Sequence, residues 1–105
     1  MTWELFFTKE AQAKLDELSA DPAKDSIYKQ VKKALGNLQR NPRHRSLQTH
    51  KYSSIAGPSG QDVFEAYAQN RAPGAYRIFF FYGPDRRENG RRVAVISILT
   101  IMPHP

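Results

Sequence analysis

Apolar and polar residues follow a helical period in the first half of this chain and a strand period in the second half. Residues 3–7 form a short apolar run that predicts a first β-strand. Thr8 is suited to cap a helix, and apolar side chains then recur with helical spacing at Ala11, Leu15 and Leu18. The chain therefore begins with a strand that leads into an amphipathic helix.

A second amphipathic helix follows directly. Asp21-Pro22 separates the two helices, because Asp suits the cap position and Pro the first helical position. The second helix ends at Asn41-Pro42. Its apolar side consists of Ile27, Val31, Ala34, Leu35 and Leu38, and its other side carries Lys29, Lys32, Lys33 and Arg40. The short connection predicts an antiparallel pair of helices.

Residues 42–61 are predicted to be a loop, because prolines and glycines recur along them. Beyond this segment, strand-like patterns occupy three runs, which are residues 63–69, 75–82 and 93–102. Pro73-Gly74 predicts a type II turn within residues 70–74, between the first two runs. Asn89-Gly90 predicts a hairpin turn in the charged segment that precedes the last run.

The resulting order of elements, βααβββ, predicts an α+β fold. Two helices that precede a block of strands are expected to pack together, as a hairpin, on one face of a mostly antiparallel sheet. The length of 105 residues and the absence of a linker predict a single domain that spans residues 1–105. The strand that pairs with the first strand does not follow from the sequence.

Arg77 is the most informative residue, because it lies within the apolar strand of residues 75–82. A guanidinium without a partner is costly in such a place, so Arg77 either pairs with an acid on the next strand or binds an external anion. With the predicted turn as the connection, Tyr67 pairs opposite Arg77 and Glu65 pairs opposite Phe79. The rest of the chain favours the external anion.

This register separates the side chains of the two strands into unlike faces. The face expected to support the helices holds Phe64, Ala66, Ala68, Ile78 and Phe80. The other face holds Val63, Glu65, Tyr67, Arg77, Phe79 and Phe81. A shift of one residue would mix the two sets, so this register is preferred. We expect the second face to be open and lined by aromatic rings.

Charge is distributed unevenly along the chain. Residues 1–25 contain six acids against three lysines, whereas residues 26–61 contain seven Lys or Arg and no acid. A block of this kind indicates an anionic partner, either nucleic acid or an acidic protein segment, although a solvated helix face is the usual alternative. The candidates for contact with an RNA backbone are Arg43, Arg45, His50 and Lys51.

Several classes of protein are disfavoured by the sequence. It contains no cysteine, no visible signal peptide and no apolar run long enough to span a membrane, so we expect a soluble cytoplasmic protein. The three histidines lack the spacing of metal ligands, and no phosphate-binding loop or nucleophilic triad is present. No metal and no cofactor is therefore expected.

The βααβββ order, the basic second helix and the strand Ala75-Tyr76-Arg77-Ile78-Phe79-Phe80-Phe81-Tyr82 together resemble the RelE/ParE superfamily of bacterial toxins. The resemblance covers nearly the whole chain. In the RelE-like branch, members cut messenger RNA at the ribosome without a metal, and the 2′-hydroxyl of the RNA attacks the adjacent phosphate. The matching strand arginine stabilises that phosphate, which implies this role for Arg77. Glu65 resembles the acid that some branches use as a base.

The chain departs from the RelE-like pattern at its C-terminal end. It has no arginine, tyrosine or helix after the last strand, and His104 is the group that can replace them. Lysines that RelE-like toxins carry before the turn are replaced by Glu65 and Tyr67. The predicted catalytic set is therefore Glu65 as base, Arg77 as cation and His104 as acid. Tyr67 and Phe79 are predicted to stack an unpaired base.

The predicted protein is thus a toxin that acts as a metal-independent endoribonuclease on ribosome-bound mRNA and is inhibited by a cognate antitoxin. Two alternatives remain open, which are a ParE-like inhibitor of DNA gyrase and a degenerate member that only binds a partner. Glu65 and Arg77 also have a purely structural interpretation as a cross-strand ion pair.

Overall fold

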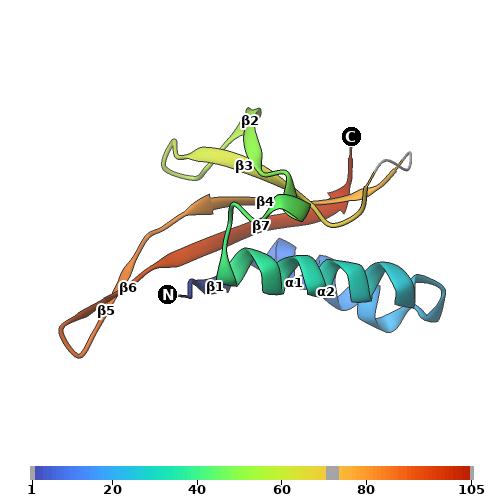
Figure 1. Ribbon diagram of the computed structural model, residues 1–105, viewed down its shortest axis with the longest axis horizontal. Coiled ribbons are helices and arrows are strands. Elements are labelled where there is room, and N and C mark those ends of the chain that lie inside the picture. Colours follow the sequence, from blue (N-terminus) through green and yellow to red (C-terminus); the bar gives the residue numbers. More distant parts are fainter. Residues whose placement is uncertain (1, 71–73, 105) are drawn as a thin grey trace.

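Two helices lie along one face of a five-stranded sheet in the computed structural model, which describes residues 2–70 and 74–104 (Figure 1). The helical elements are α1 (Lys9–Ala20), η1 (Pro22–Lys24), α2 (Asp25–Arg40) and η2 (Arg45–Leu47). The strands are β1 (Glu4–Phe7), β2 (His50–Ala56), β3 (Asp62–Tyr67), β4 (Tyr76–Tyr82), β5 (Arg86–Glu88), β6 (Arg91–Val93) and β7 (Val95–Pro103). The predicted α+β class and pair of helices are confirmed.

The predicted capping residues begin the helical elements. The Thr8 hydroxyl accepts a hydrogen bond from Ala11 N at 3.1 Å, as an N-cap does. The same hydroxyl donates to the carbonyl of Leu99 on β7 at 2.8 Å. Asp21 caps η1 by accepting from Ala23 N at 3.0 Å, and α2 continues directly from η1. Thr8 therefore ties the start of α1 to the sheet.

The strand order in the sheet is β1-β7-β4-β3-β2. β7, the last of the described strands along the chain, therefore lies inside the sheet, between β1 and β4. β1 pairs with β7 in parallel, and the other three pairs are antiparallel. The predicted register is confirmed, with Tyr67 opposite Arg77 and Glu65 opposite Phe79. The sequence did not identify β7 as the partner of β1.

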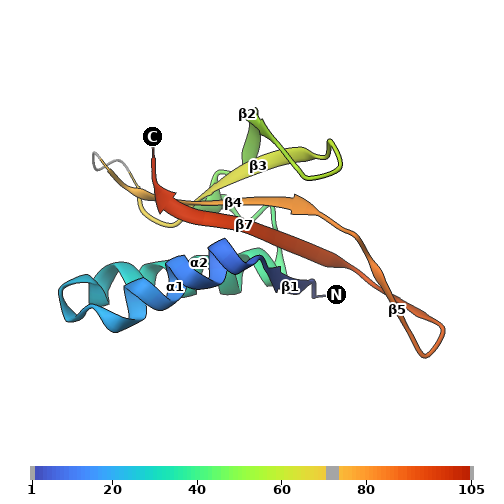
Figure 2. The ribbon, with the colours of Figure 1, turned by 180° about the vertical axis from the view of Figure 1, so that it is seen from behind.

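The predicted helix-facing side of the sheet forms the core with the two helices. Ala66, Ile78 and Phe80 are fully buried in the cluster that also contains the apolar residues of α1 and α2, and Phe64 and Ala68 pack against it. Figure 2 shows from behind that both helices lie on this one side of β4 and β7. The alternation of side chains thus determined correctly which face of the sheet the helices cover.

The prediction that residues 42–61 form a loop is wrong. This segment contains η2 and the edge strand β2, which pairs with β3 through His50 opposite Glu65 and Lys51 opposite Phe64. The strand was missed because its residues are mostly polar and all except Tyr52 are exposed. A mostly exposed edge strand lacks the apolar alternation on which the prediction depended.

The second face of the sheet is also less open than predicted. β2 lies over it in Figure 1, and the Tyr52 ring packs edge-on against Phe79 with 5.0 Å between centroids. Val63, Phe79 and Phe81 are consequently buried. The strand that sequence analysis had assigned to a loop therefore covers part of the face expected to be exposed.

The charged segment before the last strand folds as the predicted hairpin. β5 and β6 pair across Asn89 and Gly90, which both have positive φ angles of 51° and 77°. Such angles suit Asn-Gly in a tight hairpin turn. The predicted type II turn at Pro73-Gly74 involves residues outside those described. No helix in the described part of the chain is both long and apolar enough to cross a membrane.

Candidate active site

Four polar side chains from neighbouring strands meet near one end of the sheet. They are His50 at the start of β2, Glu65 on β3, Arg77 on β4 and His104 directly after β7. His50 lies directly opposite Glu65, and Arg77 lies diagonally from Glu65. The backbone N–H of His104 donates to the carbonyl of Ala75 at 2.8 Å, which continues the pairing of β7 with β4. Strand pairing therefore positions all four residues.

Glu65 is the centre of this arrangement. Its Oε1 lies 2.7 Å from His50 Nε2, and its Oε2 lies 2.9 Å from His104 Nδ1. The Glu65 side chain is 2% exposed, whereas the side chains of His50 and His104 are 46% and 49% exposed. A buried carboxylate thus holds one half-exposed imidazole on each of its oxygens. We call these three residues the His-Glu-His cluster.

Arg77 supports the cluster from inside the protein. Its Nε lies 3.6 Å from Glu65 Oε2, its Nη1 donates to the carbonyl of Gln69 at 2.7 Å, and its guanidinium lies 3.7 Å from the Tyr67 ring centroid. The residue is only 6% exposed. The cross-strand ion pair is therefore present, and the guanidinium is not presented to an external anion, contrary to the alternative that the sequence favoured.

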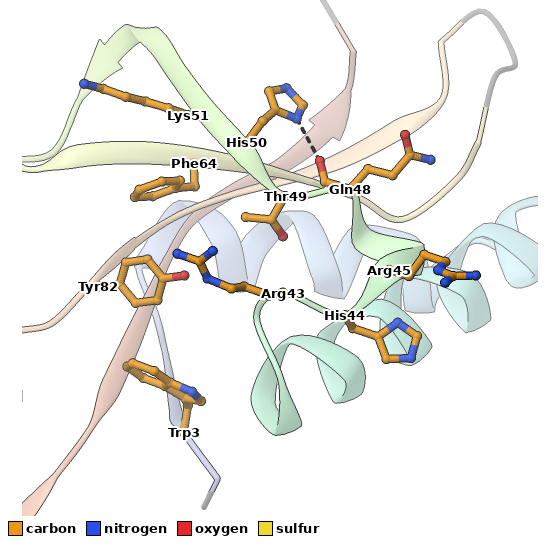
Figure 3. A pocket seen from close by; sticks show the side chains of 10 residues that line it. All are labelled: Trp3, Arg43, His44, Arg45, Gln48, Thr49, His50, Lys51, Phe64 and Tyr82. Atoms are coloured by element: carbon orange, nitrogen blue, oxygen red, sulfur yellow. Dashed lines mark hydrogen bonds between the residues drawn. The ribbon is translucent and has the colours of Figure 1, made fainter.

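His50 has two acceptors, one at each ring nitrogen. Its Nδ1 lies 2.8 Å from the carbonyl of Gln48, and its Nε2 lies against the Glu65 carboxylate (Figure 3). Both ring nitrogens of His50 are therefore engaged within the protein. In contrast, His104 contacts Glu65 through Nδ1, and its Nε2 has no hydrogen-bond partner among residues 2–70 and 74–104. The two imidazoles are therefore chemically different.

The predicted stacking of a base on Tyr67 and Phe79 does not fit this geometry. Phe79 is 1% exposed beneath Tyr52, so no face of its ring is accessible. One face of the Tyr67 ring is covered by the Arg77 guanidinium, and the His50 ring packs edge-on against Tyr67 at 5.9 Å between centroids. These two rings are not available to stack a base, because Tyr52 of β2 and the guanidinium of Arg77 already cover them.

The residues predicted to contact RNA backbone do come together. Arg43, Arg45, His50 and Lys51 all line one cavity with a volume of about 680 Å³ (Figure 3). We call it the basic cavity. Its other lining residues are Trp3, His44, Gln48, Thr49, Phe64 and Tyr82. None of these described residues is acidic.

Sequence analysis missed Trp3 and Tyr82 in the basic cavity. They lie at the ends of β1 and β4, which are separated in the sheet by β7. Their ring centroids are 5.3 Å apart. In each case, an aromatic residue at the end of a predicted strand was the available signal. The sequence could not show that Trp3 and Tyr82 lie together, because it did not show where β1 pairs.

Burial and charge act in opposite directions on Tyr82. Burial, the larger effect, raises the pKa of its phenol above the ordinary value of 10.0, and the positive charge of Arg43 lowers it. Tyr82 is therefore a neutral hydroxyl at physiological pH. The described residues include no group of three or more His, Cys, Asp or Glu side chains arranged to hold a metal ion.

Comparison with known proteins finds a similar structure but no similar sequence. No protein-family model matches the chain, and no curated protein matches its sequence. The structure is similar to "The structure of YoeB dimer from Staphylococcus aureus", with a TM-score of 0.59 and 10% sequence identity over 100% of both chains. At this level of sequence identity, the similarity shows that the two chains share a fold.

Proposed function

We propose that this protein is the toxin of a bacterial toxin–antitoxin system and cuts mRNA on the ribosome without a metal ion. The observation that carries the proposal is the His-Glu-His cluster, in which a buried carboxylate orients two half-exposed imidazoles. Cleavage by a 2′-hydroxyl requires a base, an acid and positive charge beside the phosphate. The cluster offers the base through the half-exposed His104 imidazole.

The geometry favours His104, and not Glu65, as the base. The Glu65 carboxylate is buried and both of its oxygens are engaged, so a 2′-hydroxyl has no direct access to it. With its Nδ1–H donating to Glu65, His104 keeps a lone pair on the exposed Nε2. Glu65 then acts as the residue that fixes the orientation and tautomer of the ring.

The proposed reaction is a transfer of the phosphoryl group within the RNA. His104 Nε2 takes the proton of the 2′-hydroxyl while the 2′-oxygen bonds to phosphorus. The bond from phosphorus to the 5′-oxygen breaks, and the leaving oxygen takes a proton from a water molecule. The hydroxide that remains regains a proton from the His104 imidazolium. His50 gives no proton in this step, because both of its ring nitrogens lie against protein acceptors. The products are a 2′,3′-cyclic phosphate and a 5′-hydroxyl end. Arg77 balances the charge of Glu65 and holds it in place.

A cognate antitoxin is the second proposed partner. The segment of residues 26–61 carries seven basic residues and no acid, so an acidic or amphipathic antitoxin segment complements it. Such a segment would compete with RNA for the same positive charges. Inhibition by the antitoxin is then explained by occupation of the surface.

The proposal is tested by incubating the protein with translating ribosomes and mapping mRNA 5′ ends by primer extension. We expect cuts in the ribosomal A site that His104→Ala reduces by about 10²–10⁴-fold, the usual contribution of a proton-transfer group. The control is Gln12→Ala, because Gln12 is an exposed residue of α1 that contacts Asp16 and lines neither the cluster nor the basic cavity. Absence of cuts with folded protein, or equal cutting by the His104 variant, would contradict the proposal.

A further inference from the structure

We infer that the basic cavity binds an unpaired nucleotide of the RNA strand that the His-Glu-His cluster cuts, with its base against Trp3 and Tyr82. The inference rests on the proposed function, because the cluster supplies the reason for RNA to lie nearby. It adds a binding site on the other side of strand β2. The ligand class follows from the shape, the aromatic rings and the charge of the cavity.

The cavity has a suitable size for one nucleotide. Its volume of about 680 Å³ is within the range of pockets that enclose small molecules. It is formed where β1 begins, where β4 ends and where the segment between α2 and β2 turns back toward the sheet (Figure 3). Elements from both halves of the chain therefore form the cavity, so it is not the surface of a single solvated loop.

Aromatic rings line one side of the cavity. Tyr82 lies between Phe64 and Trp3 in Figure 3, with 5.3 Å between its ring centroid and that of each neighbour. Tyr82 is 37% exposed although it belongs to an otherwise buried strand. An accessible ring at this position offers a stacking surface for a base, which the buried Phe79 does not.

Positive charge lines the other side. Arg43, Arg45 and Lys51 lie around the cavity, and none of its described lining residues carries a negative charge. Lys51 forms an exposed ion pair with Asp62 at 3.3 Å, which solvent and RNA phosphate can replace. A ligand with a flat aromatic ring and an anionic group matches this combination, and a nucleotide has both. Since the base must reach the rings, it must be unpaired.

The position of His50 connects the basic cavity to the cluster. His50 is one of the residues that line the cavity. Its imidazole points away from Trp3 and Tyr82 (Figure 3) and contacts Glu65 on the other side of β2. Because β2 is the edge strand, a single RNA strand can pass over this edge from one side to the other.

The test uses the fluorescence of Trp3, which is the single tryptophan of the chain. The probe is a single-stranded hexanucleotide with 2′-O-methyl groups, which cannot be cleaved because it has no 2′-hydroxyl. We expect saturable quenching by the hexanucleotide and none by inorganic phosphate at the same phosphate concentration. Arg43→Ala is expected to weaken binding at least tenfold. The matched control, Arg87→Ala, removes the same charge from the hairpin of β5 and β6, where Arg87 does not line the basic cavity, and is expected to change binding less than twofold.

A second variant separates stacking from charge. Tyr82→Leu keeps an apolar side chain and removes the aromatic face, so it is expected to weaken binding about tenfold while the circular dichroism spectrum is retained. Absence of quenching in the wild-type protein would overturn the inference. Equal effects of Arg43→Ala and Arg87→Ala would overturn it as well.

The ribosome assay distinguishes this inference from the proposed function. Cleavage at the A site with no Trp3 response would leave the function standing and overturn the cavity site. Saturable quenching that depends on Arg43 and Tyr82, with no cleavage, would support the cavity site and contradict the nuclease.

Discussion

Arg77 contacts the carboxylate of Glu65, the carbonyls of Gln69 and Tyr76 and the ring of Tyr67 at one end of the sheet. Two of these neighbours follow from the sequence, because the strand register places Tyr67 opposite Arg77 and Glu65 diagonally from it. The burial of Arg77 does not follow from the register alone. The sequence therefore predicts the contacts of the guanidinium better than its accessibility.

Replacing Arg77 with lysine is expected to lower the free energy of unfolding by about 2 kcal/mol. An ammonium group cannot keep the stacking on Tyr67 together with the hydrogen bond to Gln69, and lysine is therefore not equivalent at this position. Urea unfolding measures the change. Arg87→Lys, on the exposed hairpin, is the control and should change stability by less than about 0.5 kcal/mol. Equal stability of both variants would contradict the structural role of Arg77.

The two imidazoles have different expected roles in cleavage. His104 takes the proton of the 2′-hydroxyl, whereas both ring nitrogens of His50 lie against acceptors, so His50 positions Glu65 and transfers no proton. We therefore expect His50→Gln, which keeps a hydrogen-bonding side chain, to retain more single-turnover cleavage than His104→Gln. Equal losses in the two variants would contradict this division of roles.

At the scale of elements, the contact between α1 and β7 depends on a change of register in β7. Phe79 pairs with Thr100 and Phe80 with Ile98, so Leu99 is an extra residue that bulges from the ladder. The carbonyl of Leu99 accepts the hydrogen bond from Thr8, whose hydroxyl also caps α1. The cap residue is evident from the sequence, whereas the bulge that it contacts is not, because bulges leave no periodic signal.

Thr8→Ala is expected to destabilise the protein by about 2 kcal/mol, at the upper end for an N-cap, because the substitution removes the bond to Leu99 as well. Thermal or urea unfolding measures it. Ser19→Ala removes one exposed hydroxyl contact within the same helix, to the carbonyl of Asp16, and serves as the control. A loss no larger than that of Ser19→Ala would mean that Thr8 does not join the helix to the sheet.

Asp85 anchors the hairpin of β5 and β6 to β7 and predicts a dependence of stability on pH. A hydrogen bond from the backbone N–H of Val95, followed by one from Arg92, holds the pKa of Asp85 below its ordinary value of 3.8. Since the folded-state pKa is lowered, the stabilisation is present above about pH 4 and is lost as the pH falls through the folded-state pKa.

Unfolding of Asp85→Asn should accordingly be compared with that of the wild type at pH 7 and at low pH. We expect the wild type to be more stable at pH 7 and the difference to shrink as the pH falls below about 4. A difference that is independent of pH would mean that the charge of Asp85 does not stabilise the hairpin.

At the scale of the whole molecule, the charged segment and the two faces of the sheet were predictable from the sequence. Which segments cover the second face of the sheet was not. The alternation in β3 and β4 separated the helix side from the other side, and the acid-free segment of residues 26–61 did form the basic cavity together with β1 and β4. The meeting of His50 with Glu65 required β2 to be recognised as a strand. Long-range pairing of weakly patterned segments is the information that the sequence pattern lacks.

The basic cavity predicts how RNA binding depends on salt. Each phosphate contact that is lost should reduce the slope of log K against log salt by about 0.7 for a single strand. Arg43→Ala and Lys51→Ala are each expected to show this reduction in a titration with the 2′-O-methyl hexanucleotide, and Arg87→Ala is expected to leave the slope unchanged. Equal slopes in all three variants would indicate that RNA is held by the overall charge of +6 and not by the cavity.

The position of β7 within the sheet has a consequence for how the protein is made. β7 joins β1 to β4, yet it is the last of the described elements to be synthesised. Before it emerges, β1 has no partner in the sheet, the helices lack the buried β7 side chains of Ile96, Ile98 and Ile101, and His104 has not been made. Assembly therefore waits for contacts distant in sequence, which slows folding. A newly synthesised chain completes the His-Glu-His cluster only when β7 has paired with β4, so closure of the sheet and assembly of the cluster are a single event.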